Sequence, residues 1–134
     1  MIILFYTSFS MSNEVPHMES EAIVKNIYDS MNKNDVDGLS EYLAEDVQLI
    51  PLFRLSEIIS GKAAVIESII KMLSIAKETK VTFISGPIKM GDYVTVEYTH
   101  DYILNGTPAK DHNVSSFIIS QGKVKQWIGY IHPK

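Results

Sequence analysis

The chain has 134 residues, 46% of them hydrophobic, no cysteine and a formal net charge of −4. This length predicts one domain that buries a core without disulfides or a structural metal. Nucleic-acid binding requires a basic face, which the net negative charge argues against. The absence of cysteine excludes thiol catalysis and Cys-ligated zinc. No apolar run is long enough to span a membrane, and the cysteine-free composition fits a cytoplasmic location.

The apolar opening, MIILFYTSF, lacks the basic start and the small-residue cleavage site of a secretion signal. Internal methionines follow at Met11 and Met18. We expect residues 1–17 to be an N-terminal arm, which is either a loose or over-long start or an ordered arm that packs on a neighbour. Residues 18–134 then form the single domain.

Helical periodicity governs the next part of the chain. Apolar residues spaced three and four apart within 21–35 predict an amphipathic helix. Asp35 can cap a short helix over 36–43, and the β-rich segment 47–53 predicts a strand. A third helix is expected after Ser60. The buried stripes of the two long helices are predicted to be Ile23, Val24, Ile27, Tyr28 and Met31 in the first, and Ile66, Ile69, Ile70 and Leu73 in the third.

From Val81 onward the apolar pattern has a period of two and predicts strands over 80–90, 92–104, 110–120 and 123–132. Their connections are Gly91-Asp92, the segment 105–108 (NGTP) and Gln121-Gly122. Such short connections join antiparallel neighbours. Helices followed by a meander of strands indicate an α+β fold, in which a curved sheet and its helices leave a pocket between them.

Four segments, read in order, resemble the nuclear transport factor 2-like superfamily, which includes SnoaL-like proteins, ketosteroid isomerases and limonene epoxide hydrolases. They are NDVDGLSEYLAEDV, GKAAVIESII, GDYVTVEYTH and the pattern F-x-x-x-x-GKV-x-x-W, within residues 18–132. The resemblance implies a cone-shaped fold, in which three N-terminal helices and a strongly curved antiparallel sheet enclose a pocket. It also implies a homodimer through the outer face of the sheet. The fold hosts many activities, so it does not by itself give the function.

The catalytic positions that the resemblance implies are incompletely filled. Ketosteroid isomerases place a carboxylate base before the proline that is Pro51 here, but the residue is Ile50. Their tyrosine position falls at Ile27, and their aspartic acid position is Ser115. SnoaL-type cyclases place their aspartate base at the Ser115 position as well.

Limonene epoxide hydrolases offer a partial match at Asp101, which fills their acid position. Thr99 and Gly129 replace the arginine and the second aspartate of that group. Epoxide opening needs one group to activate water and another to protonate the epoxide oxygen. Each of the three residue sets is therefore incomplete, and whether the chain is an enzyme stays open.

The comparison with the epoxide hydrolases turns Asp101 inward, and alternation along the strand then turns Glu97 and Thr99 inward and His100 outward. On the next strand, Asp111 is expected inward and His112 outward. Two inward carboxylates, Asp101 and Asp111, would repel, and the pKa of one could rise. The two histidines could contribute to a metal site on the outer face, but a metal needs three or four ligands, so polar surface is preferred.

The preferred function is the binding of a small, partly apolar molecule in the cone, without a cofactor or metal and without a nucleic-acid or membrane partner. One alternative is an isomerase, cyclase or hydrolase that uses Asp101 as acid or base. Another is a dimeric association domain with a filled cavity. Trp127 would stack on a flat ligand or fill the core. The predicted pocket residues are Glu97, Thr99, Asn113, Ser115, Phe117, Trp127, Ile27, Ile50 and Phe53.

Overall fold

The computed structural model describes residues 18–51 and 57–129, which form three helices and six strands. The expected arm at residues 1–17 and the predicted pocket residue Phe53 lie outside these ranges. The helices are α1 (Ser20–Asn32), α2 (Val36–Ser40) and α3 (Lys62–Ile75), and the strands are β1 (Leu43–Pro51), β2 (Ile59–Ser60), β3 (Lys77–Met90), β4 (Tyr93–Leu104), β5 (Thr107–Ser120) and β6 (Lys123–Gly129).

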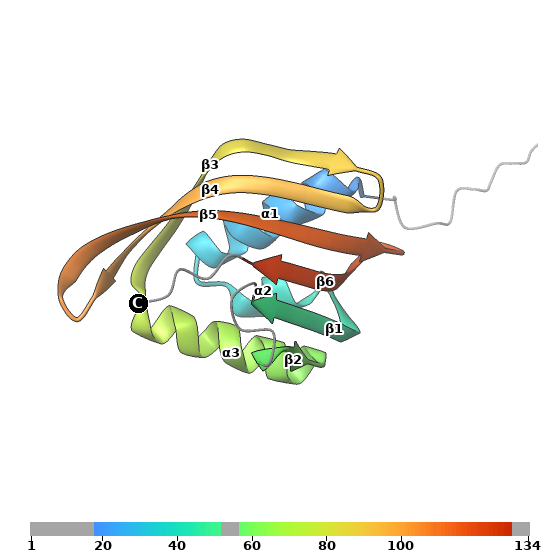
Figure 1. Ribbon diagram of the computed structural model, residues 1–134. Coiled ribbons are helices and arrows are strands. Elements are labelled where there is room, and N and C mark those ends of the chain that lie inside the picture. The colour runs from blue at the N-terminus through green and yellow to red at the C-terminus, as the bar shows by residue number, and fades with distance from the viewer. Residues whose placement is uncertain (1–17, 52–56, 130–134) are drawn as a thin grey trace, which may run out of the picture.

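The strands form one sheet in the order β2-β1-β6-β5-β4-β3, which confirms the predicted α+β fold. The pairings are antiparallel except between β1 and β6, which run parallel. Figure 1 shows the helices on one side of the curved sheet, with α1 packed mainly on β3 and β4 and α3 along the side that carries β1 and β2. The helices within the described ranges are too short or too polar to cross a membrane.

The predicted buried stripe of α1 is confirmed, because all five of its residues are buried in the core. Tyr28 lies at the centre of an aromatic cluster. Its ring centroid is 4.9 Å from that of Tyr98, 5.6 Å from that of Phe83 and 6.0 Å from those of Phe117 and Trp127. Aromatic pairs at such spacings stabilise a core beyond the area they bury, so this cluster fixes α1 against β3–β6.

The ends and faces of α2 and α3 follow the prediction only in part. Asp35 caps α2 as expected, since its carboxylate accepts a hydrogen bond from the Gly38 backbone N–H at 2.9 Å. The residue before α3 is Gly61 rather than Ser60, and Ile69 is buried while Ile70 is 51% exposed. Adjacent helical positions are rotated by about 100°, so Ile70 turns away from the stripe in which it was predicted.

The β4–β5 hairpin closes at a two-residue turn, and β5 begins at Thr107, earlier than predicted. Asn105 and Gly106 both have positive φ, 52° and 79°, as the tight turn requires. The turn pairs Leu104 with Thr107. Further along the hairpin, His100 is paired with Asp111, and Tyr93 with Ile118. Because directly opposed residues in an antiparallel pair project to the same face, this turn decides which side chains of β4 enter the cone.

Candidate functional site

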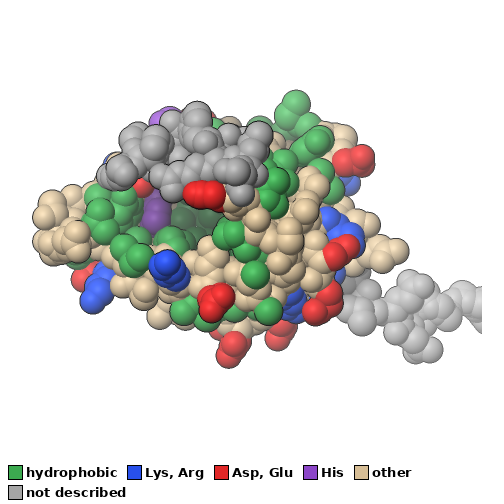
Figure 2. Space-filling model, turned by 60° about the horizontal axis from the view of Figure 1, so that its bottom comes forward, with side chains coloured by type: hydrophobic (Ala, Val, Ile, Leu, Met, Phe, Trp, Pro, Cys, Tyr) green, Lys and Arg blue, Asp and Glu red, His purple; other side chains and the backbone are tan. Residues whose placement is uncertain are grey.

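A cavity of about 480 Å³ lies between α3, α1 and the inner face of the sheet. Figure 2 shows the hollow, whose visible wall is mostly hydrophobic and contains a histidine side chain; the histidine among the described lining residues is His100. Its volume falls within the range of small-molecule sites. A wall in which a few polar groups interrupt an apolar surface is also typical of such sites. Apart from the tyrosines and Trp127, the polar lining side chains of the described residues are Ser68, Lys71, His100, Asp111, Asn113 and Ser115.

Several of the predicted pocket residues take their expected places. Asn113, Ser115 and Trp127 line the cavity from β5 and β6, and Ile50 lines it from β1. Ile27 and Phe117 are fully buried in the core beside it.

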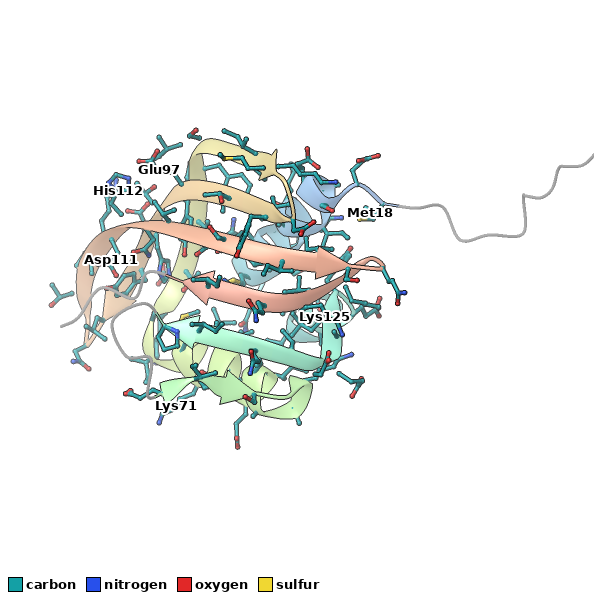
Figure 3. All side chains as sticks on the ribbon, turned by 45° about the vertical axis from the view of Figure 1, so that its right-hand side comes forward. Met18, Lys71, Glu97, Asp111, His112 and Lys125 are labelled. Atoms are coloured by element: carbon teal, nitrogen blue, oxygen red, sulfur yellow. The ribbon has the colours of Figure 1, made fainter. Side chains whose placement is uncertain are left out.

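The predicted inward orientation of Glu97, Thr99 and Asp101 is wrong. Glu97 Oε2 lies 2.5 Å from His112 Nε2 on the outer face, where Figure 3 shows the two side chains next to each other. Asp101 Oδ1 lies 3.5 Å from Lys110 Nζ, also on the outer face. Thr99 is opposite His112 in the register and shares its face. The side chains of β4 that line the cavity are Tyr98, His100, Tyr102 and Leu104.

This correction follows from the register. His100 is opposite Asp111, and Tyr98 is opposite Asn113. Because Asp111 and Asn113 point inward as predicted, the even-numbered residues of β4 that oppose them point inward too. The two histidines weighed as metal ligands therefore lie on opposite faces of the sheet. Within the described ranges, no three His, Asp or Glu side chains converge as a metal would require.

His100 is held in one tautomer by a short chain of hydrogen bonds. Its Nε2 atom lies 3.0 Å from Thr79 Oγ1, and that hydroxyl donates to the Ala76 carbonyl at 2.8 Å. A threonine hydroxyl has a single proton. Because that proton is donated to Ala76, Nε2 must carry a proton and donate to Thr79. In the neutral ring, Nδ1 is then the unprotonated nitrogen.

The Nδ1 atom of His100 has no hydrogen-bond partner among the described residues, and it is not a fully enclosed atom. The ring lines the cavity and stacks on Tyr102, with centroids 4.6 Å apart. In the neutral ring, Nδ1 is therefore a hydrogen-bond acceptor that no described residue uses. Its protonation state depends on opposing effects: burial lowers the pKa of His100, while the charges of Asp111 and Asp101 raise it by less. The net pKa is lowered, so the ring is neutral at pH 7.

Asp111 is the carboxylate that faces the cavity. It lines the wall next to His100, and its Oδ2 atom accepts a hydrogen bond from the Tyr102 hydroxyl at 2.7 Å. Charge-assisted bonds of this kind are stronger than neutral ones. Asp111 is thus positioned to stabilise a positive charge on His100 if the ring takes up a proton from a ligand.

The Tyr28 hydroxyl is a buried donor without a partner in the part of the chain described. Tyr28 is 2% exposed and lines the cavity. The side chains of Tyr98, Ser115 and Trp127 are close enough to influence its pKa, which burial raises well above 10.0, but none completes a hydrogen bond with it. The Tyr98 and Ser115 hydroxyls instead pair with each other at 3.1 Å.

Comparison with known proteins assigns the fold. The SnoaL-like domain family matches residues 24–127, which is well over half of the chain. The chain belongs to the SnoaL-like domain family. No curated protein matches the sequence.

Solved structures similar to this SnoaL-like domain share its fold at low sequence identity. A ketosteroid isomerase-like hypothetical protein from Catenulispora acidiphila DSM 44928, in complex with trimethylamine, has 15% identity over 81% of this chain and 84% of its own, with a TM-score of 0.72. An LEH-like epoxide hydrolase from M. tuberculosis has 16% identity over 84% and 77%, also with a TM-score of 0.72. The epoxide hydrolase/cyclase-like enzyme SalBIII, which acts in pyran ring formation in salinomycin, has 21% identity over 81% and 87%, with a TM-score of 0.71.

Two residues of this SnoaL-like site were missed from the sequence. His100 was placed on the outer face, although the Asn105-Gly106 turn carried the signal that would have placed it correctly. Tyr28 was correctly predicted to be buried, but nothing in the sequence indicates that its hydroxyl lacks a partner.

Proposed function

We propose that this SnoaL-like domain binds a small, partly apolar molecule in its cone. The observation that carries the proposal is the cavity of about 480 Å³, which the described side chains leave open. An association domain with a filled cavity would need its own large side chains in that space. The apolar wall favours an apolar ligand body, and the His100 end favours a ligand with polar groups at one side.

The experiment uses 1-anilinonaphthalene-8-sulfonate, an apolar fluorescent probe, together with the single tryptophan of the chain. Trp127 lines the cavity, so a probe bound there should quench its emission through energy transfer. We would compare Ser68→Phe, which places a ring into the cavity wall, with Ser74→Phe on the exposed face of the same helix.

We expect wild type and Ser74→Phe to bind one probe per chain with quenching of Trp127, and Ser68→Phe to lose at least about tenfold in affinity, since a blocked pocket removes buried contact area. Equal binding by the two variants, or no binding by wild type, would reject the cavity as a binding site.

A second candidate function is proton-transfer catalysis with His100, rather than Asp101, as the base. It is favoured by the Nε2–H tautomer, which leaves Nδ1 as the basic nitrogen of a ring that lines the cavity. In such a step, Nδ1 would take a proton from a carbon next to a ketone, and the electron pair of the broken C–H bond would move to the ketone oxygen. Asp111 would stabilise the resulting imidazolium. Return of the proton to the same or a conjugated carbon completes exchange or isomerisation.

Deuterium exchange tests this candidate, because reversible abstraction exchanges the α-protons of a ketone in D₂O. We would follow 2-indanone by NMR with wild type, with His100→Gln and with His112→Gln on the outer face. We expect exchange with wild type and His112→Gln but not with His100→Gln. Equal rates with all three would argue against His100 as a base.

We also propose a homodimer formed through the outer face of the sheet. Exposed apolar side chains support it: Ile88 and Val114 are 50% and 43% exposed, and both lie on the outer face by register. The cytoplasmic location expected from the cysteine-free sequence stays a prediction.

A further inference from the structure

One face of α3 forms the wall of the cavity that lies across from the sheet. Its lining residues Ser68, Lys71, Met72 and Ile75 follow the three- and four-residue spacing of a helical stripe. Lys71 and Ile75 are exposed although they line the cavity, so this part of the stripe lies at its mouth. A lysine at such a position lays its apolar stem along the wall and keeps its ammonium group in water.

The ammonium group of Lys71 is a positive charge without a partner in the part of the chain that the structure describes. Lys62, on the same helix, forms an ion pair with Glu45 at 3.6 Å, whereas Lys71 Nζ makes no ion pair or hydrogen bond with a described residue. Apart from the neutral His100, Lys71 is the only basic side chain among the described lining residues. Figure 2 shows a Lys or Arg side chain at the edge of the hollow.

The negative charge of the lining is on the opposite wall. Asp111 lines the cavity from β5, and Figure 3 shows it well separated from Lys71 on α3. The Tyr102 hydroxyl already donates a hydrogen bond to Asp111 at 2.7 Å. An anionic group on a ligand would be repelled by Asp111 and attracted by Lys71, so the two charges favour one orientation of an anionic ligand.

We propose that the ligand is a carboxylic acid with an apolar, ring-containing body, which binds with its carboxylate at Lys71. The body lies between the apolar parts of the two walls, which include Leu49, Ile69 and Trp127. The carboxylate stays at the mouth, where water still solvates it, so the cost of burying a charge is largely avoided. This inference rests on the proposed binding function and names the class of ligand for the same cavity.

The experiment compares three probes that share a naphthalene body. 1-Naphthaleneacetate is an anion, 1-naphthaleneacetamide is neutral, and 2-(1-naphthyl)ethylamine is a cation. Titration calorimetry at about pH 7.5 keeps His100 neutral. We expect the anion to bind wild type about three- to tenfold more tightly than the amide, as for a partly solvated ion pair, and the cation to bind no better than the amide. Acidic side chains also lie around the hollow in Figure 2, so tightest binding by the cation would reject the proposed charge.

Two variants assign the preference to its residue. Lys71→Met removes the charge and keeps an apolar stem, and Lys62→Met removes the same charge from a position of α3 outside the cavity lining. In Lys71→Met, the anion should bind no better than the amide, while the amide keeps its wild-type affinity. Lys62→Met should behave as wild type. Persistence of the preference in Lys71→Met, or its loss in Lys62→Met, would overturn the proposal.

A measurement on wild type alone protects the test if a variant fails to fold. Salt screens an ion pair at the mouth of a cavity. Raising the sodium chloride concentration from about 0.05 M to about 0.5 M should therefore shrink the preference for the anion and leave the affinity of the amide nearly unchanged. A preference that does not change with salt would contradict an ion pair with Lys71.

The neutral amide separates this inference from the proposed function. If the amide binds wild type but not Ser68→Phe, and charge makes no difference, the ligand class is wrong and the binding function stands. If none of the three probes binds and the anilinonaphthalene probe does not bind either, both fail together.

Discussion

His100 and Asp111 are directly opposed across the β4–β5 hairpin, and both project into the cavity. Neighbours on the same strand diverge, so this cross-strand pair, and not the adjacent pairs His100-Asp101 and Asp111-His112, brings an imidazole and a carboxylate together. Burial disfavours the charged imidazole, while the carboxylate favours it. His100 is therefore neutral in the resting protein, and Asp111 would stabilise the ring if it took up a proton.

Tyr28→Phe should stabilise the ligand-free protein by about 1 kcal/mol, since it removes a buried donor that has no partner. Tyr102→Phe is the matched control on the same cavity, and it should destabilise by about 1–2 kcal/mol because it breaks the bond to Asp111. Urea unfolding of both variants checks the signs. A loss of stability in Tyr28→Phe as large as that in Tyr102→Phe would mean that the Tyr28 hydroxyl does have a partner.

His100 should make stability depend on pH below its ordinary pKa of 6.5. Because the folded-state pKa is lower than the unfolded-state value, the unfolded chain binds the proton first as the pH falls. Stability therefore decreases from about pH 6.5 downward, until the pH passes the folded-state pKa and the difference becomes constant. We would measure urea midpoints of wild type and His100→Gln between about pH 7.5 and pH 5. Wild type should lose more stability than the variant, and parallel curves would contradict the expected shift.

Asn32→Ala should cost about 2 kcal/mol of unfolding free energy, because the side-chain amide makes two bonds to one residue of β3. Asn32 Nδ2 donates to the Val81 carbonyl at 3.0 Å, and Asn32 Oδ1 accepts from the Val81 N–H at 2.6 Å. Asn26→Ala, on the same helix, loses longer contacts of 3.3 and 3.4 Å and should cost less. Equal losses in chemical denaturation would show that the Val81 bonds add little.

Val114→Lys should convert the proposed dimer into a monomer, since it places a charge in the middle of the outer sheet face. Ile70→Lys, at a 51% exposed position on α3, is the control that should leave the assembly unchanged. Light scattering coupled to size exclusion gives the mass. A monomeric wild type, or a dimer that survives Val114→Lys but not Ile70→Lys, would place any interface elsewhere.

The helices and the hairpins could be predicted because their signals are local. The stripe of α1 and the Asp35 cap depend on residues within one or two turns of each other, and both are confirmed. The parallel pairing of β1 with β6 joins segments more than seventy residues apart, and no local pattern reports it.

The candidate site was predicted less well, for a reason visible in the hairpin. The orientation of Asp101 was taken from a comparison with other proteins and conflicts with the hairpin connection, which was predicted to have four residues (105–108) and has two, Asn105 and Gly106. Any connection with an even number of residues makes Asp101 and Asp111 project to opposite faces. The turn therefore excluded the pair of inward carboxylates, and it paired His100 with Asp111 instead. The open volume of the cavity depends on packing at many positions, which the sequence does not report.

The two bonds between Asn32 and Val81 also limit how the protein can associate. β3 is the last strand of the sheet, and such an edge normally offers free backbone groups to an incoming strand. At Val81 both groups are already occupied by a side chain that imitates a neighbouring strand. Extension of the sheet by another chain is blocked at this point, so peptides cannot add there by strand pairing. One asparagine at the end of α1 thereby protects this edge of the sheet against pairing with another strand at Val81.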